Sequence, residues 1–131
     1  MKFGDTLQSA DWKKEKHIPV IEIPDTIEAG KPFAVTVSVG KEIPHPNTTG
    51  HHIKWIDVYF KPENEKFIHQ VGHFDFSAHA ESTKGDNEGT VLTNPIATFS
   101  MTVKEPGTLV ALELCNIHGV WESSAEIKLA E

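Results

Sequence analysis

Hydrophobic and polar residues alternate with a period of two along much of the chain. In the segment 33–39, Phe33, Val35, Val37 and Val39 share one face, and smaller or polar residues lie between them. This alternation is typical of a strand with one buried face, and further segments either alternate or are rich in β-branched and aromatic residues. The strands predicted in this way cover residues 18–23, 33–39, 53–60, 67–76, 97–103, 108–114 and 125–129.

Turn-forming residues separate these segments, among them Pro24-Asp25, Ala29-Gly30 and Glu105-Pro106-Gly107. About seven short strands at this spacing predict an all-β fold, an immunoglobulin-like antiparallel β-sandwich. A helical turn is expected only within residues 5–11, and the polar segment 78–95 is expected to be a surface loop. With 131 residues, the chain 1–131 is expected to fold as a single domain.

Composition narrows the possible partners. The chain has 12 basic and 19 acidic residues and a formal net charge of -7. This balance argues against a nucleic-acid or membrane-surface binder, because phosphate groups would be repelled. A single cysteine cannot form an intrachain disulfide, which excludes a disulfide-stabilised secreted scaffold. No signal-peptide core and no bilayer-spanning stretch is found, so a soluble cytoplasmic protein is expected.

The candidate chemistry lies in one cysteine and several histidines. Cys115 and His118 are separated by a two-residue spacer, which lets both side chains converge from one tight turn. His45 and His51 belong to a second loop, and His17 precedes the first strand. Because loops at one end of a sandwich converge, these side chains can share a site. One sulfur among several nitrogens favours a mononuclear redox metal over structural zinc.

Each of these residues is weak evidence alone, since a buried cysteine is often inert. His51 and His52 are adjacent, so at most one of them easily points into the site if the chain is extended there. His69, His73 and His79 lie on or near a strand without ligand-like partners. We expect these three to be solvated or core-edge residues.

Taken together, four segments resemble superoxide reductase of the one-iron class, also called neelaredoxin, in the desulfoferrodoxin iron-binding domain family. The matching segments are 15–19 (EKHIP), 40–49 (GKEIPHPNTT), 51–53 (HHI) and 115–122 (CNIHGVWE). The resemblance runs along nearly the full chain. It implies one mononuclear non-haem iron per chain, with four equatorial histidines and an axial cysteine thiolate. Carried over by motif position, the equatorial ligands are His17, His45, His51 and His118, and the axial ligand is Cys115.

The resemblance also implies an activity and partners. The reaction is reduction of superoxide to hydrogen peroxide, with electrons from a rubredoxin-like donor. The chain is expected to be a homo-oligomer, such as the homotetramer that related one-iron proteins often form. Glu15 matches the residue that can occupy the sixth iron position in the oxidised state. Lys16 matches the charged residue near the open position, where it would attract the anionic substrate. Backbone N–H groups after Cys115 are expected to hydrogen bond to the sulfur.

Two residues depart from the family pattern. Gly50 stands where an acidic residue often precedes the histidine pair, which would loosen the loop that carries His51. Glu113 lies on the same strand face as Cys115 by alternation. If its carboxylate pointed at the sulfur, it would lower the potential of the iron.

Two other classes of protein share some of these features. A cupredoxin-like electron carrier would also be a β-sandwich with cysteine and histidine on one loop. However, both methionines, Met1 and Met101, precede Cys115, and four site histidines exceed what blue copper uses. A structural immunoglobulin-like binding module would leave the cysteine and histidine motifs unexplained.

Overall fold

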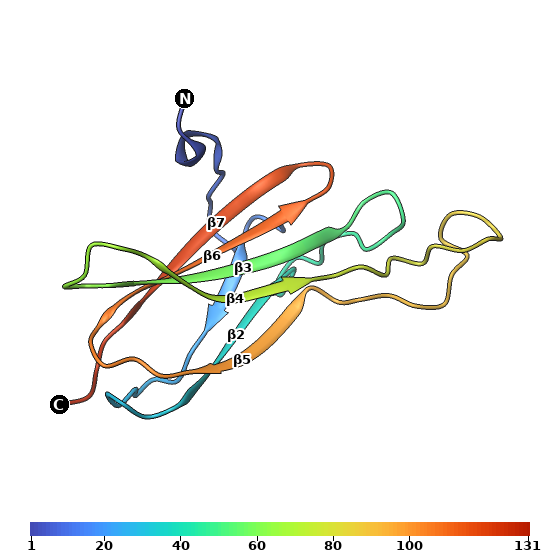
Figure 1. Cartoon of the computed structure of the whole chain (residues 1–131). Coiled ribbons are helices and arrows are strands. Elements are labelled where there is room, and N and C mark those ends of the chain that lie inside the picture. Colours follow the sequence, from blue (N-terminus) through green and yellow to red (C-terminus); the bar gives the residue numbers. More distant parts are fainter.

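Two antiparallel sheets form the computed structural model of the chain, which describes residues 1–131 (Figure 1). The strands are β1 (Pro19–Glu22), β2 (Phe33–Val39), β3 (Ile53–Pro62), β4 (His69–Asp75), β5 (Ile96–Met101), β6 (Gly107–Cys115) and β7 (Gly119–Ile127). One sheet has the order β1-β2-β5 and the other the order β4-β3-β6-β7. The predicted all-β sandwich is confirmed.

The structure corrects two boundaries. The helical turn expected within residues 5–11 is a short 3-10 helix, η1 (Phe3–Thr6), none of whose residues is buried. The alternation predicts the last strand only from residue 125, but β7 begins at Gly119. Its first half is partly exposed and is held by backbone pairing with β6, which a side-chain pattern does not reveal. No helix in the structure could cross a membrane.

The core lies between the two sheets. Val35 and Val37 of β2, Ile56 and Val58 of β3, and Leu109 of β6 are all 0% exposed. Four of these five are β-branched, and such side chains pack well on a pleated surface. Burial of each such side chain contributes roughly 1.5–3 kcal/mol. The alternation that predicts the strands therefore also predicts the core.

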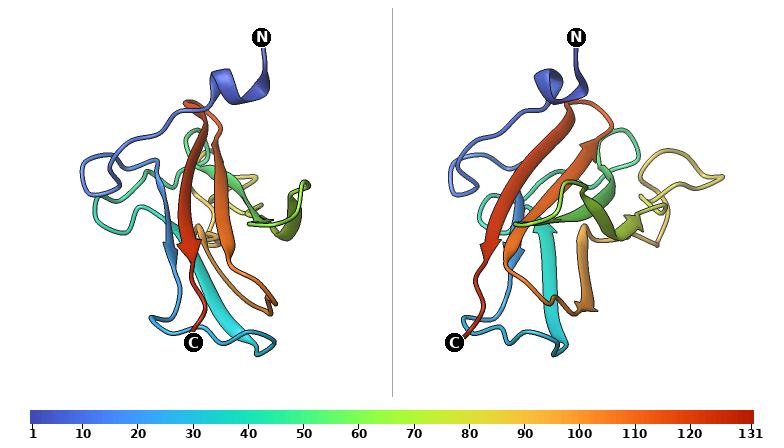
Figure 2. Two further views of the ribbon diagram at one scale, coloured as in Figure 1. Left: turned by 90° about the vertical axis from the view of Figure 1, so that its left-hand side faces the viewer. Right: turned by 60° about the vertical axis from the view of Figure 1, so that its left-hand side comes forward.

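The strand register brings several loops to one end of the sandwich (Figure 2). Cys115 at the end of β6 pairs with Ile53 at the start of β3 and with Gly119 at the start of β7. In the other sheet, Pro19 at the start of β1 pairs with Val39 at the end of β2. Gly119 has a φ of 83°, which glycine adopts without strain. The segment before β1, the β2–β3 connection and the β6–β7 turn consequently meet.

The polar segment between β4 and β5 is a loop, as predicted, and it extends away from the sandwich as a long hairpin (Figure 1). Not all of it is exposed. His79 and Ala80, near its base, are 3% and 6% exposed. The base of this hairpin therefore packs against the protein.

Candidate metal centre

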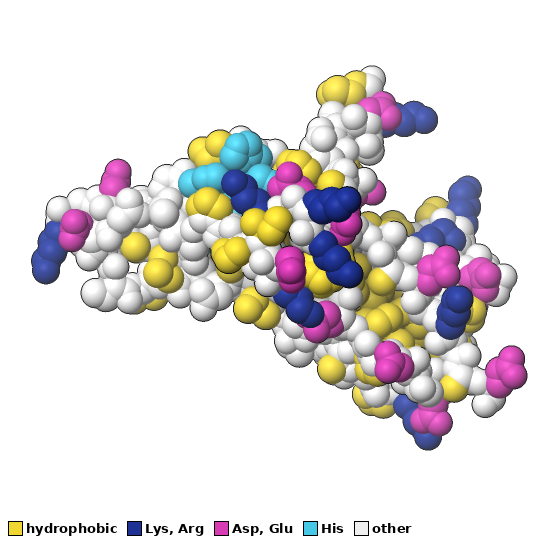
Figure 3. Space-filling view, turned by 180° about the vertical axis from the view of Figure 1, so that it is seen from behind, with side chains coloured by type: hydrophobic (Ala, Val, Ile, Leu, Met, Phe, Trp, Pro, Cys, Tyr) yellow, Lys and Arg dark blue, Asp and Glu magenta, His cyan; other side chains and the backbone are white.

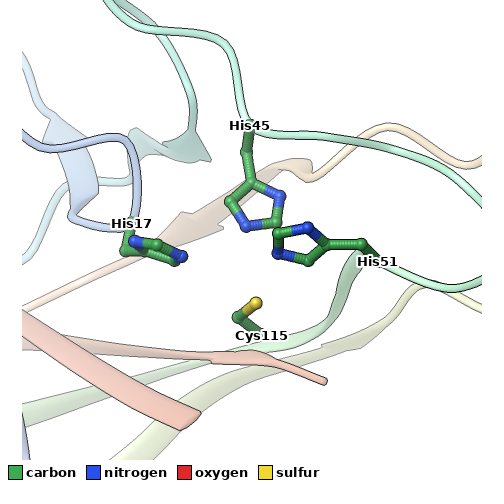
Figure 4. Close-up of side chains that lie close together, drawn as sticks. All are labelled: His17, His45, His51 and Cys115. Carbon is green, nitrogen blue, oxygen red and sulfur yellow. The ribbon is translucent and has the colours of Figure 1, made fainter. Parts of the chain in front are cut away.

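Four of the five predicted ligands form one cluster (Figure 4). Ligand atoms of His17, His45, His51 and Cys115 all lie within 4.8 Å of one another. His17 comes from the segment before β1, His45 and His51 from the β2–β3 connection, and Cys115 from the end of β6. His17 and Cys115 are buried, and the other two are half-buried. Three distant segments thus supply one site.

His118 completes the group from the β6–β7 turn. Its Nδ1 lies 3.7 Å from Cys115 Sγ and 3.2 Å from His17 Nε2. Its ring centroid is 4.9 Å from that of His17 and 5.0 Å from that of His51. Its backbone N–H donates to Cys115 Sγ at 3.3 Å, which is the expected bond to the sulfur. All five predicted ligands are therefore brought together.

Two ring nitrogens in this cluster need a partner. Nε2 of His45 and Nε2 of His51 are buried and have no hydrogen-bond partner. His45 Nδ1 lies 2.7 Å from the carbonyl oxygen of Pro46 and donates to it, which leaves the lone pair of Nε2 free. Buried polar atoms without partners are rare, and a metal ion would satisfy both. The residues present therefore fit a metal bound by nitrogen and sulfur.

The charge state of the histidines also suits a metal. Burial lowers the pKa of His45 to about 4, although the hydrogen bond to Pro46 opposes it. Burial also lowers the pKa of His17, against the effect of the neighbouring Glu15 carboxylate, and that of His51. These rings are consequently neutral near pH 7. Metal binding requires the neutral form of histidine, so no proton has to be displaced.

Glu15 contacts His17 rather than pointing at an open position of the cluster. Its Oε1 accepts hydrogen bonds from His17 Nδ1 at 2.6 Å and from the backbone N–H of His17 at 3.1 Å. Burial raises the pKa of Glu15, but these two bonds outweigh it and hold the pKa below its usual value. A carboxylate on Nδ1 fixes the ring so that Nε2 faces the cluster. Glu15 thus orients one of the predicted ligands.

Lys16 supplies positive charge next to the cluster. Its side chain is half-buried, and its charge contributes to lowering the pKa values of His17, His45 and His51. The histidines gather at the surface, and a positively charged side chain lies beside them (Figure 3). Positive charge therefore lies at the surface next to the cluster.

Residues outside the predicted ligand set hold the site together. Asn116 accepts a hydrogen bond from His52 N at 2.9 Å and donates to Gly50 O at 3.0 Å, and its own backbone N–H donates to His52 O at 3.1 Å. These hydrogen bonds tie the loop at Gly50 to the β6–β7 turn, and the loosening expected there stays a prediction. Gly40 has a φ of 91°, and a Cβ there would lie 2.8 Å from His45 N. The sequence does carry a signal for this role, since Gly40 shortly precedes His45, which Pro44 and Pro46 flank.

The histidines outside the cluster are not all alike. His69 and His73 are exposed on β4, where they pair with carboxylates, in line with expectation. His79 is instead buried and stacks on His52, with 3.5 Å between ring centroids. The solvated alternative is therefore wrong for His79.

Glu113 is buried on the inward face that it shares with Cys115, as alternation predicts. It is 0% exposed, and neither carboxyl oxygen has a hydrogen-bond partner, so it makes no bond to the sulfur. Burial, and then the negative charge of Glu15, raise its pKa to about 9. At neutral pH this carboxyl is protonated and carries no charge next to the site.

Comparisons with known proteins agree with this geometry. The sequence profile described as Desulfoferrodoxin matches residues 9–124. Neelaredoxin of Megalodesulfovibrio gigas is 58% identical over 129 residues, which cover 98% of this chain and 99% of the relative. Superoxide reductase of Pyrococcus furiosus is 52% identical over 125 residues, which cover 95% of this chain and 98% of the relative. The structure of superoxide reductase (neelaredoxin) from Archaeoglobus fulgidus in the reduced form has a TM-score of 0.88 at 50% identity, with 94% and 98% of the two chains covered.

Proposed function

The chain belongs to the desulfoferrodoxin family, and we propose that it is a superoxide reductase, an oxidoreductase that acts on superoxide. One observation carries this proposal. The sulfur of Cys115 and one ring nitrogen from each of three histidines lie within 4.8 Å of one another, and two of these histidines have a buried Nε2 without a partner. The reaction adds one electron and two protons to superoxide and yields hydrogen peroxide.

We propose that His17, His45, His51, His118 and Cys115 would hold one mononuclear iron. Bound iron would supply the electron and an open position for the anion, and a thiolate ligand would donate charge to it. The same donor set argues against a cupredoxin-like carrier, because blue copper uses fewer histidines. The His118 N–H bond to Cys115 Sγ would moderate the charge on the sulfur.

Lys16 has a proposed role before the reduction of superoxide, and Glu15 has one after it. We propose that Lys16 attracts superoxide, because the chain as a whole is acidic and only a local positive charge can offset the repulsion. Glu15 holds His17 in the conformation found here, and its carboxylate would have to leave His17 to serve as a sixth ligand of oxidised iron. Both residues lie in the segment before β1, so one short movement could shift them together.

The remaining partners follow from the family resemblance. We propose a rubredoxin-like electron donor and a homo-oligomer, of which a tetramer is the form that the resemblance implies. The outer face of the four-stranded sheet supports association, since it carries apolar side chains on its two central strands, among them Tyr59, Val110, Leu112 and Leu114. A location in the cytoplasm would keep Cys115 reduced, as metal binding requires.

Metal analysis followed by superoxide kinetics tests the proposed function. We expect about one iron per chain. The ferrous protein should consume superoxide and form hydrogen peroxide without releasing dioxygen, which separates a reductase from a dismutase. Protein that takes up no iron, or iron-loaded protein that leaves superoxide untouched, would contradict the proposal. Copper in place of iron would favour the electron carrier.

A further inference from the structure

A second group of side chains lies behind the metal centre and holds the loop that carries His45 and His51. We name residues 44–52 the ligand loop and residues 77–93, at the β4–β5 hairpin, the strap. We propose that the strap, acting through His79, positions the ligand loop for metal binding. This inference rests on the proposed function, because it assigns the strap a role in holding that metal.

The ligand loop has little structure of its own. It lies between β2 and β3 and contains no strand, because β3 begins only at Ile53. Its one internal turn is closed by Thr48 and His51, whose backbone groups exchange hydrogen bonds of 2.9 and 3.3 Å. Fixing a flexible residue costs about 1–2 kcal/mol of conformational entropy, so a loop of this kind needs partners outside itself. Asn116 is one partner, and the strap is the other.

The strap binds the ligand loop through hydrogen bonds at two positions. Thr49 Oγ1 donates to the carbonyl oxygen of His79 at 2.9 Å, and Thr49 N donates to Asn87 Oδ1 at 2.8 Å. Asn87 N donates back to Thr49 Oγ1 at 3.0 Å. Asn47 Nδ2 donates to Thr93 O at 3.0 Å, and Asn47 Oδ1 lies 2.9 Å from His79 Nδ1. These two positions lie between His45 and His51 in the chain.

His79 connects the ligand loop to the sheet. It is 3% exposed, and its Nε2 lies 2.7 Å from the carbonyl oxygen of Phe76. Phe76 is a core residue whose N–H donates to Lys54 O on β3 at 2.8 Å. The His79 ring is parallel to that of His52 within 6°. A neutral ring can donate to only one of the two oxygens that face it, Asn47 Oδ1 and Phe76 O, but these contacts and the stacking on His52 confine it. His79 therefore couples the position of the loop to that of β3.

The strap is itself an ordered hairpin. Ala80 N donates to Val91 O, and Gly89 N donates to Ala80 O, both at 2.9 Å. A Cβ at Gly89 would lie 2.4 Å from Glu81 O, so the close approach requires glycine. Asn87 has a φ of 65°, a conformation that asparagine tolerates better than most residues. The strap can therefore hold the ligand loop in one place.

The test compares His79→Gln and Thr49→Val with wild type, and His69→Gln is the matched control because His69 is exposed on β4 and does not touch the loop. Each ferrous protein is mixed with an iron chelator, and the rate of iron release is followed. We expect release roughly fivefold faster or more in both variants, because each loses hydrogen bonds between the ligand loop and the strap. The visible sulfur-to-iron absorption band of the oxidised protein should shift in both variants and not in the control.

The metal-free proteins are also melted, to separate positioning from stability. A lower melting temperature with wild-type iron release and a wild-type band would overturn the proposal, since the strap would then only stabilise the fold. If His79→Gln does not fold, Thr49→Val carries the same test, because it keeps the shape of the side chain and removes its hydroxyl. If the wild-type protein takes up no iron, the proposed function is refuted and this inference with it. If the wild-type protein binds iron and both variants release it at the wild-type rate with a wild-type band, this inference alone is overturned.

Discussion

The buried carboxyl of Glu113 makes the stability of the metal-free protein depend on pH. Its pKa is raised from the usual 4.5 to about 9, chiefly by burial. The pKa of Glu113 is therefore higher in the folded than in the unfolded protein. Below pH 4.5 the carboxyl is protonated in both states and costs nothing, and the free energy of unfolding falls as the pH rises from there toward 9. Each unit of pH in this window lowers the free energy of unfolding by about 1.4 kcal/mol. At pH 7 the accumulated loss is about 3 kcal/mol.

Glu113→Gln removes the titration and keeps the size of the side chain. We expect the difference in free energy of unfolding between this variant and wild type to move in favour of the variant by about 1.4 kcal/mol per pH unit between pH 5 and 8. Urea unfolding of the metal-free proteins measures this difference, and the titration of the site histidines cancels in it. Metal-free protein is used because a nearby cation would favour the ionised carboxylate.

The exposed Glu126 on β7 provides the control. Glu126→Gln makes the same substitution at a side chain that is not buried, so it separates the effect of burial from that of the substitution itself. A Glu113→Gln difference that does not change with pH would refute the reasoning, because it would mean that the buried carboxyl ionises in the folded protein as easily as in the unfolded chain.

Three further predictions concern the site. Lys16→Ala should lower the second-order rate with superoxide several-fold and flatten its dependence on ionic strength, and an unchanged rate in stopped-flow measurements would contradict the attraction of the anion. Glu15→Ala should leave catalysis largely intact and change the absorption spectrum of the oxidised iron; an identical spectrum would exclude ligation. Gly40→Ala should lower the melting temperature and the iron content, because its Cβ would lie 2.8 Å from His45 N. Gly30→Ala is the control, since Gly30 also has a positive φ, of 77°, but open space around it, and this variant should lower only the melting temperature.

Alternation predicts the elements that have one buried and one exposed face. It succeeds for β2, where Val35 and Val37 are buried and Ala34 is exposed. It misses the first half of β7, where Ser123 and Ser124 are held by backbone pairing with β6. Their side chains carry no hydrophobic signal, so only the partner strand explains why these residues are extended.

The candidate site was predictable as a set of side chains but not as a supported structure. The spacing of Cys115 and His118 and the motif resemblance identify five residues that the structure brings together, although their assignment as iron ligands stays a prediction. The roles of Asn116 and His79 depend on contacts 64 and 32 residues away in sequence. No local pattern encodes such distant partners, and the raised pKa of Glu113 likewise depends on burial that only the folded chain creates.

The buried polar side-chain atoms that lack partners are His45 Nε2, His51 Nε2 and the two carboxyl oxygens of Glu113. Glu113 lies on β6 two residues before Cys115, so all of these atoms belong to the metal end of the sandwich. Such atoms destabilise a fold and persist where function requires them. The two histidine nitrogens would gain a partner when metal binds. Metal binding should therefore remove the unfavourable contribution of the histidines and raise the melting temperature.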